Sequence, residues 1–281
     1  MDKAAGRARV PVELDAVSET LLWTLYYRAS EARRPDGVLR DPLAAELTDR
    51  IDFPFESRFG RAGSVTAQIQ GLRARCFDEQ VRWFLAGHPD GTVVALGEGL
   101  ETQFWRVDNG RVRWLTVDLP EVTALRRRLL PDPPSGRVRA LAGSATDLGW
   151  MDRVDATRGV LVVAQGLFMY LPPEQVRRLV AACAQRFPGG GLVFDAVPHW
   201  FAKATASGRV RASTGYRAPP MPWALDVDEQ PGLRDLHPNI ATVRDLRPPR
   251  GRGLLGRLLP RVNLIPVLRH KRPSAVLLTF G

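Results

Sequence analysis

The chain has 281 residues, of which 44% are hydrophobic and 25% are charged. These values are typical of globular proteins and exclude intrinsic disorder over most of the chain. The length suits one elaborated α/β domain rather than two large ones. No apolar run approaches the roughly 20 residues of a membrane-spanning helix, so we expect no membrane partner.

The two cysteines, Cys76 and Cys183, lie in segments with a helical pattern. Neither has a CxxC or histidine partner at metal-ligand spacing, so we expect neither a disulfide framework nor a metal site. Residues 1–15 contain no apolar signal segment. Together these features predict a protein of the reducing cytoplasm.

The formal net charge is +10, which is a feature of many nucleic-acid-binding proteins. Eight basic residues and no acidic residue follow Asp245, however, so the rest of the chain is nearly neutral. We therefore expect no nucleic-acid partner. Residues 253–268 mix arginines with leucines, as membrane-surface segments do, but Pro260 and Pro266 interrupt any long helix. We expect a connector packed beside the last two strands, with its arginines in solvent.

The N-terminal part of the chain is predicted to be helical. Apolar residues recur there at helical spacing, and Ser18-Glu19 and Asp41-Pro42 are residue types that begin helices. The expected helices are 18–32, a short helix that begins at Asp41, and 64–86. A break is expected at 53–55.

Strands and helices alternate in the remainder. Apolar segments rich in β-branched residues, separated by helical segments, indicate βαβ units and a mostly parallel sheet. The expected strands are 92–96, 112–117, 138–142, 159–164, 191–196, 240–246 and 274–280, with helices at 120–130 and 172–187. Residues 198–238 have many prolines, glycines and aromatic residues and no sustained period, so we interpret them as an insertion after the fifth strand. The predicted fold class is α/β, a doubly wound sheet of seven strands.

The first strand ends in a glycine turn, Gly97-Glu98-Gly99. A Gly-x-Gly at this place lets the backbone approach a ligand at the carboxyl edge of a parallel sheet. Asp118 ends the second strand, nineteen residues after Gly99. A carboxylate there can accept hydrogen bonds from the ribose hydroxyls of an adenosine. The two features predict an adenosine cofactor.

The residues around the turn indicate which cofactor binds. Thr102 stands where the dinucleotide fingerprint has its third glycine. Glu98 and Glu101 flank the helix N-terminus at which a diphosphate would bind, and two carboxylates repel a diphosphate. S-adenosylmethionine has no phosphate and carries two cationic groups, so the pattern favours it. The alternative interpretation is that both glutamates point to solvent.

Several segments resemble the leucine carboxyl methyltransferase family, in particular its bacterial branch of polyketide carboxyl O-methyltransferases of the tetracenomycin type. In chain order they are RASEARRPDGVLRDPLAAEL, VVALGEGLETQFWR, VDLPEV, AQGLFMYLPPEQV and the closing LLTFG. The likeness covers nearly the whole chain, and it is specific for the family but loose for the substrate. It implies a class I, Rossmann-like methyltransferase core at 89–281 with a substrate lid at about 198–238. Residues 1–88 would be a helical cap and a cofactor-binding helix.

The resemblance also implies which residues bind S-adenosylmethionine. They are Arg73 for the methionyl carboxylate, Gly97 and Gly99 in the turn, Asp118 for the ribose with Leu119 next to it, Asp147 and Leu148 at the adenine, and Gln165 with Gly166 where the family usually has Glu-Gly. Three of these side chains have purely structural alternatives: an exposed helix arginine for Arg73, a strand-end turn for Asp118, and a helix N-cap for Asp147.

The chain departs from the family pattern at three positions. Glu101 and Gln103 replace an aspartate and an arginine, and Gln165 replaces a glutamate. The Gln165 oxygen can still accept a hydrogen bond from the methionyl ammonium, but the ion pair is lost. We therefore expect weaker cofactor binding than is typical of the family.

Methyl transfer is an in-line displacement that depends mainly on alignment. A carboxylate acceptor, with a pKa of about 4, is ionised at neutral pH, whereas a phenol, with a pKa of about 10, usually needs a general base. His199 and Tyr216, both in the lid, are the candidates for such a base, and surface positions are the alternative. Arg28 in the cap is a candidate to clamp an acceptor carboxylate. Its alternative is a salt bridge to Glu31 or another nearby acid.

Three function classes follow. The leading one is a small-molecule O-methyltransferase that acts on a carboxylate or phenol of a polyketide-like metabolite. The second is a methyltransferase for peptide or protein C-terminal carboxylates, which requires an open groove. The third is a non-catalytic S-adenosylmethionine-binding homologue.

Overall fold

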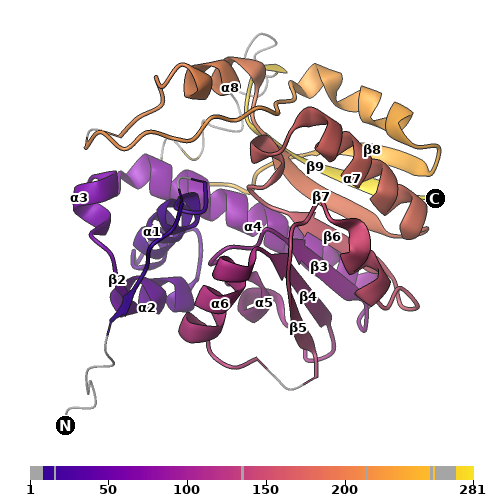
Figure 1. The fold of residues 1–281 in the computed structure, drawn as a ribbon, viewed down its shortest axis with the longest axis horizontal. Coiled ribbons are helices and arrows are strands. Elements are labelled where there is room, and N and C mark those ends of the chain that lie inside the picture. The colour runs from indigo at the N-terminus through magenta and orange to yellow at the C-terminus, as the bar shows by residue number, and fades with distance from the viewer. Residues whose placement is uncertain (1–8, 16, 134–135, 213, 254–255, 257–269) are drawn as a thin grey trace.

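A seven-stranded sheet forms the centre of the protein, with strand order β5-β4-β3-β6-β7-β9-β8 (Figure 1). The computed structural model describes residues 9–15, 17–133, 136–212, 214–253, 256 and 270–281. The strands are β3 Thr92–Leu96, β4 Arg113–Asp118, β5 Val138–Ala142, β6 Val160–Ala164, β7 Gly191–Ala196, β8 Ile240–Leu246 and β9 Ser274–Phe280. Among these strands, β9 runs antiparallel to both of its neighbours, β7 and β8, and all other neighbouring strands are parallel. The prediction of a mostly parallel, seven-stranded α/β sheet is confirmed.

Helices cover both faces of this sheet. One face carries α4 (Ser64–Gly87) and α5 (Gln103–Val107), and the other carries α7 (Pro173–Arg186) with the 3₁₀ helices η1 (Leu148–Arg153) and η3 (Val227–Leu236). Side chains alternate across a strand. Val93 and Ala95 therefore point into the first layer, while Val94 and Leu96 point into the second. Burial on both sides explains why the central strands are continuous apolar runs.

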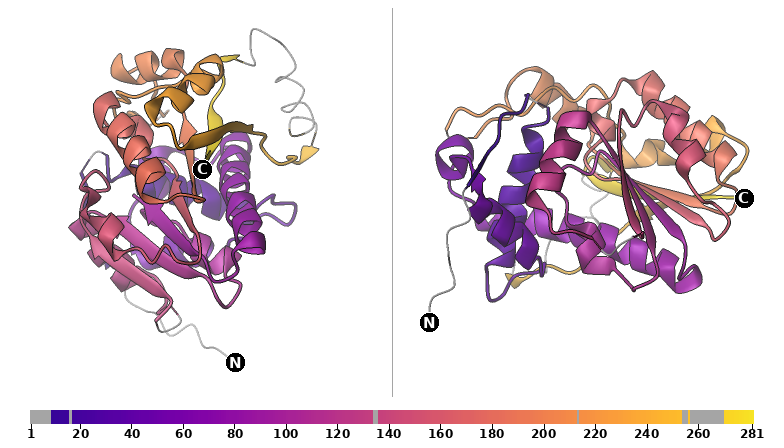
Figure 2. Two further views of the ribbon diagram at one scale, coloured as in Figure 1. Left: turned by 90° about the vertical axis from the view of Figure 1, so that its right-hand side faces the viewer. Right: turned by 60° about the horizontal axis from the view of Figure 1, so that its bottom comes forward.

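A helical cap lies beside the sheet (Figures 1 and 2). It consists of α1 Thr20–Ala32, α2 Pro42–Arg50, α3 Phe55–Phe59 and the short parallel pair β1 Val10–Pro11 and β2 Ile51–Asp52. Its apolar side chains share one cluster with α6 (Pro120–Leu129) of the core. Asp41 caps α2 as predicted, because its carboxylate accepts a hydrogen bond from the Ala44 amide at 3.0 Å. Glu19 precedes α1 but makes no side-chain capping bond.

The insertion after β7 contains more regular structure than the sequence predicts. It includes α8 (His199–Ala206), a β-bridge between Arg211 and Arg217, and η3. The insertion contacts the cap, because the Tyr216 ring lies 4.9 Å from the Phe59 ring, measured between centroids. The Thr214 hydroxyl also donates to the Arg58 carbonyl at 2.7 Å. These contacts join the insertion to the cap.

None of the described helices is both long enough and apolar enough to cross a membrane. The connector that we predicted at residues 253–268 lies outside the described residues, apart from Gly253 and Gly256.

A buried network of ion pairs joins the cap to the sheet. Arg28 of α1 lies 2.7 Å from Asp41 and 2.9 Å from Glu101, which follows β3. Arg106 of α5 lies 2.9 Å from the same Asp41 carboxylate, 2.7 Å from Glu101 and 2.8 Å from Asp78 of α4. All five residues are almost fully excluded from solvent. Each buried charge therefore depends on its partners, because an unpaired charge in the interior is very costly.

Replacing Asp41 by alanine should destabilise the protein by about 3–5 kcal/mol, because two buried arginines then lose a partner. The matched control is Asp49→Ala on the same helix. Asp49 pairs with Arg33, but its side chain is 75% exposed, so its loss should cost less than about 1 kcal/mol. Urea unfolding followed by circular dichroism measures both changes. Similar, small effects for the two variants would contradict the structural role of the network.

Candidate functional site

The predicted glycine turn lies at the carboxyl edge of the sheet, directly after β3. Gly97 has φ +58° and Gly99 has φ +55°. This left-handed conformation is disfavoured for residues other than glycine. The Gly97 amide donates to the Val117 carbonyl of β4 at 2.8 Å. The turn thereby remains close to the end of the neighbouring strand, as the sequence predicts.

Asp118, at the end of β4, holds this turn in place. One carboxylate oxygen accepts from the Gly99 amide at 2.7 Å and the other from the Leu119 amide at 2.8 Å. Burial raises the pKa of Asp118, and the two backbone hydrogen bonds lower it again in part. A carboxylate has about four acceptor positions, so two remain after these bonds. Asp118 can thus hold the turn and accept hydrogen bonds from a ligand at once.

The two glutamates of the turn do not point to solvent, so that alternative interpretation was wrong. Glu98 lies 2.9 Å from Arg126 of α6 and accepts a 2.6 Å hydrogen bond from the Thr116 hydroxyl. Burial raises the pKa of Glu98, and Arg126 offsets only part of this effect. Burial acts in the same direction on Glu101, but Arg106 and Arg28 lower its pKa to about 2. Both carboxylates have arginine partners, so the electrostatic argument against a diphosphate loses its force.

Arg73 lies at the same edge, where α4 passes the ends of β6 and β7. Its guanidinium contacts the Asp195 carboxylate through Nε at 2.8 Å and Nη2 at 2.7 Å. The other Asp195 oxygen accepts from the Gly166 amide at 2.6 Å. A β-carbon at Gly166 would lie 2.6 Å from Arg73 Nη2, and φ there is +74°. Glycine at position 166 is therefore required for this position of Arg73.

Gln165, next to Gly166, has one satisfied and one unsatisfied polar atom. Its Nε2 donates to Glu101 at 3.1 Å. Its Oε1 is buried and has no hydrogen-bond partner among the described residues. Buried acceptors are rarely left unpaired, so this oxygen is a candidate acceptor for a donor of a ligand.

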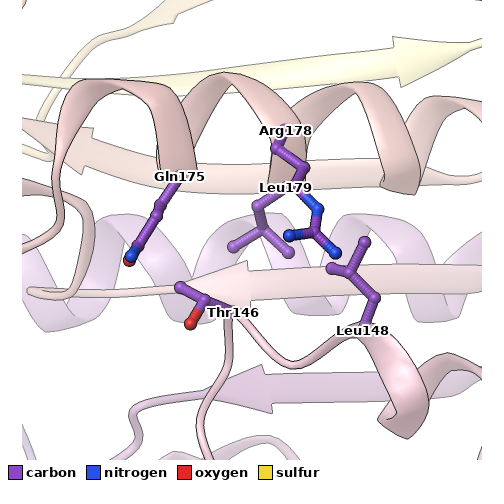
Figure 3. Close-up of a pocket in the computed structure, with 5 residues that line it drawn as sticks. All are labelled: Thr146, Leu148, Gln175, Arg178 and Leu179. Carbon is purple, nitrogen blue, oxygen red and sulfur yellow. The ribbon is translucent and has the colours of Figure 1, made fainter.

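Asp147 and Leu148, which were predicted at the adenine, lie in the loop after β5. Asp147 is the N-cap of η1, with its carboxylate accepting from the Gly149 amide at 3.3 Å. Its structural alternative is therefore observed, and its contact with adenine stays a prediction. A small hollow of about 60 Å³ adjoins the loop. Figure 3 shows that Gln175 and Arg178 of α7 face Thr146 and Leu148 across it.

The three candidates for acceptor chemistry occupy other environments. Arg28 is 2% exposed and is bound to Asp41 and Glu101, so the predicted clamp on an acceptor is wrong. The salt-bridge alternative holds, with Asp41 rather than Glu31 as the nearby acid. His199 is about half exposed and lies 2.8 Å from Glu229, a surface position. Tyr216 is buried against the cap, and burial raises its pKa, so it anchors the lid and is a poor base.

The sequence profile of the leucine carboxyl methyltransferase family matches residues 22–184, more than half of the chain. The chain belongs to this family. The tetracenomycin polyketide synthesis O-methyltransferase TcmP from Streptomyces glaucescens is 38% identical over 205 residues, which cover 73% of this chain and 74% of TcmP. The S-adenosyl-L-methionine-dependent methyltransferase dpfgK from Gibberella zeae is 30% identical over 194 residues, or 64% of this chain and 65% of dpfgK.

An O-methyltransferase family protein from Burkholderia thailandensis is among the similar solved structures. Its sequence is 16% identical. The matched region covers 93% of this chain and 71% of the Burkholderia chain, with a TM-score of 0.44. The family assignment depends on the sequence matches. As a member of the leucine carboxyl methyltransferase family with these relatives, the protein is a methyltransferase, and its cofactor is S-adenosylmethionine.

The partners of the site residues were not predicted from the sequence. Asp195 holds Arg73 and Gly166, and Arg126 neutralises Glu98. Asp195 was visible only as an acid at the end of a predicted strand, where ligands of α/β sheets bind. Nothing in the local sequence around Arg126 distinguishes it from its exposed neighbours Arg127 and Arg128.

Asp118→Ala should weaken binding of S-adenosylhomocysteine at least tenfold. The variant lacks the predicted ribose acceptor, and hydrogen bonds to charged groups contribute about 1.5–3 kcal/mol each. Glu121→Ala, an exposed acid on the first turn of α6, is the control and should bind normally. Calorimetry measures both. An unchanged dissociation constant in folded Asp118→Ala would reject the ribose role.

Arg73→Gln should weaken S-adenosylmethionine by about 1.5–3 kcal/mol, because the amide retains a donor for Asp195 but has no charge for the methionyl carboxylate. Binding of 5′-methylthioadenosine, which lacks the amino-acid moiety, should change far less. Arg75→Gln, on a different face of α4, is the control and should leave both affinities unchanged. Equal losses for the two ligands would mean that Arg73 acts through folding alone.

Proposed function

We propose that this protein transfers the methyl group of S-adenosylmethionine to a carboxylate or phenol oxygen of a small, polyketide-like molecule. The observation that carries the proposal is the 38% identity to a tetracenomycin polyketide synthesis O-methyltransferase across about three quarters of each chain. The arrangement at the carboxyl edge of the sheet supports it. A peptide acceptor is less favoured, because the lid contacts the cap through Tyr216 and Thr214.

The polar atoms at the sheet edge fit the cofactor. In the proposed complex, Arg73, which also pairs with Asp195, donates a hydrogen bond to the methionyl carboxylate, and Gln165 Oε1 accepts one from the ammonium. Asp118 uses its remaining lone pairs for the ribose, and the turn through Gly97 and Gly99 lets the backbone approach the ligand. Leu119 and Gly166 flank these contacts, while Asp147 and Leu148 are assigned to the adenine. The cofactor supplies an electrophilic methyl group, and these residues align it.

We assign the acceptor to an apolar and aromatic cluster near the end of β7. Met169, Val197 and Met221 form a cluster between η2 (Phe168–Tyr170), the end of β7 and the lid. Tyr170 and Phe201 pack against it. Met169, Val197 and Met221 are buried, so the partly buried Tyr170 and Phe201 at the edge of the cluster are the side chains that a flat, largely apolar acceptor would contact first.

The titratable groups near this cluster favour a carboxylate over a phenol. Burial raises the pKa of Tyr170 and of Tyr216, so both remain protonated at neutral pH and cannot remove a proton. His199 is exposed and is bound to Glu229. A carboxylate acceptor is already ionised and requires no base, so alignment and exclusion of water suffice.

A transfer assay with labelled S-adenosylmethionine tests the function. We expect transfer to aromatic polyketide-like acids, and little or none to peptides that end in a free carboxylate. Transfer to peptides alone would overturn the proposal. Binding of the cofactor without transfer to any acid, phenol or peptide would indicate the non-catalytic alternative.

The pH dependence of the rate distinguishes the two oxygen acceptors. With a carboxylate, the rate should be constant from about pH 6 to pH 9, because the acceptor is ionised throughout. With a matched phenol, the rate should rise about tenfold per pH unit below the phenol pKa of about 10, since Tyr170, Tyr216 and His199 do not act as the base. A phenol rate that levels off near neutral pH would reveal a base and contradict this assignment.

A further inference from the structure

The Glu101 carboxylate bridges the cap and the cofactor site, with a different task for each oxygen. Oε1 lies 2.7 Å from Arg106, 2.9 Å from Arg28 and 2.8 Å from the Thr102 amide that donates to it. Oε2 accepts from Gln165 Nε2 at 3.1 Å. The first oxygen is thus fixed by the buried network, and the second is directed to a residue at the end of β6.

This contact determines which way the Gln165 amide faces. A carboxamide has a donor end and an acceptor end of nearly equal shape, and only its hydrogen-bond partners distinguish them. An ionised carboxylate accepts hydrogen bonds and cannot donate them. The Gln165 nitrogen must therefore face Glu101, and its oxygen must face away. That oxygen is the buried acceptor without a partner among the described residues.

The negative charge of Glu101 maintains this orientation of the Gln165 carboxamide. Arg28 and Arg106 surround the carboxylate, and the pKa of Glu101 is about 2. The group therefore stays ionised at neutral pH, where it accepts hydrogen bonds and cannot donate one that would let the amide reverse.

We propose that Glu101 is a positioning residue, which holds the Gln165 carboxamide so that Oε1 accepts a hydrogen bond from the methionyl ammonium of the cofactor. The inference rests on the proposed cofactor site and adds a residue to it. The helical cap also takes part in this positioning, because Arg28 of α1 pairs with Glu101. Arg28 itself lies in the buried network and not at the ligand.

A double-mutant cycle with Glu101→Gln and Gln165→Met tests the proposal. Calorimetry with S-adenosylhomocysteine, which has the ammonium, is compared with 5′-methylthioadenosine, which does not. Gln165→Met should weaken S-adenosylhomocysteine about tenfold and 5′-methylthioadenosine less than twofold. Glu101→Gln should cause a loss of about threefold to tenfold with the same selectivity, because the neutral amide at 101 no longer fixes the orientation.

The decisive comparison is the double variant. If Glu101 acts through Gln165, adding Glu101→Gln to Gln165→Met should cause no further selective loss. An additive loss, or equal losses for the two ligands, would overturn the proposal. Gln230→Met is the control for removing a buried amide, since Gln230 bonds to Ser274 in another part of the protein, and both affinities should then stay unchanged.

A second variant, Gln165→Glu, leaves Glu101 and the network intact, and it tests the same contact if Glu101→Gln does not fold. In Gln165→Glu, two carboxyl groups would meet where the 3.1 Å contact now lies, and their repulsion holds a proton near neutral pH. Binding of the ammonium releases that proton, so affinity for S-adenosylhomocysteine should rise between about pH 5 and pH 8. Affinity for 5′-methylthioadenosine should stay constant. Flat profiles for both ligands would overturn the contact between residues 101 and 165.

The outcomes separate this inference from the proposed function. Wild-type protein that binds no S-adenosylhomocysteine would contradict the cofactor site itself. Wild-type protein that binds it and transfers methyl groups, combined with an additive cycle, would contradict only the positioning role of Glu101.

Discussion

The ion-pair network of Arg28, Arg106, Asp41, Asp78 and Glu101 is the interaction on which the site depends. Its members come from α1, the N-cap of α2, α4, the turn after β3, and α5, so the network fixes the cap, α4 and the turn relative to one another. Removing one member while the others stay buried would leave a charge without a partner, which is costly, so the five positions depend on one another. The edge of the site is therefore held by the same contacts that hold the fold.

The sheet was predictable because its information is local. Strands buried on both faces are short apolar runs rich in β-branched residues. In β3 and β6 every residue is buried, and both sequences are such runs. The short helices α5 and α8 escaped prediction, since a helix of five or eight residues has little intrinsic stability. Such helices form because tertiary contacts hold them. Phe104 and Val107 of α5, for example, are buried in the layer beneath the sheet.

The same distinction applies to the site. The turn at Gly97 and Gly99 and the strand end at Asp118 were predictable, because glycine turns and strand ends have local sequence signatures. The observed left-handed φ angles and the hydrogen bond from the Gly99 amide to Asp118 agree with that prediction. The roles of Glu98 and Arg28 were misjudged because their partners are distant in sequence. Arg126 lies 28 residues from Glu98, and Thr102 lies 74 residues from Arg28. A charged residue in isolation looks the same whether it binds a ligand or another part of the chain.

Two carboxylates at the sheet edge share one arrangement. Asp195 binds Arg73 with one oxygen and the Gly166 amide with the other, and Glu101 binds arginines with one oxygen and the Gln165 amide with the other. In both cases an ion pair of the fold fixes a group that the ligand would use. Orientation is then established on folding, so binding requires little further ordering of these side chains. The neutral Gln165 cannot form an ion pair with the ligand. Its fixed orientation can offset part of that loss, because a side chain that is already ordered loses less conformational entropy on binding than a mobile one.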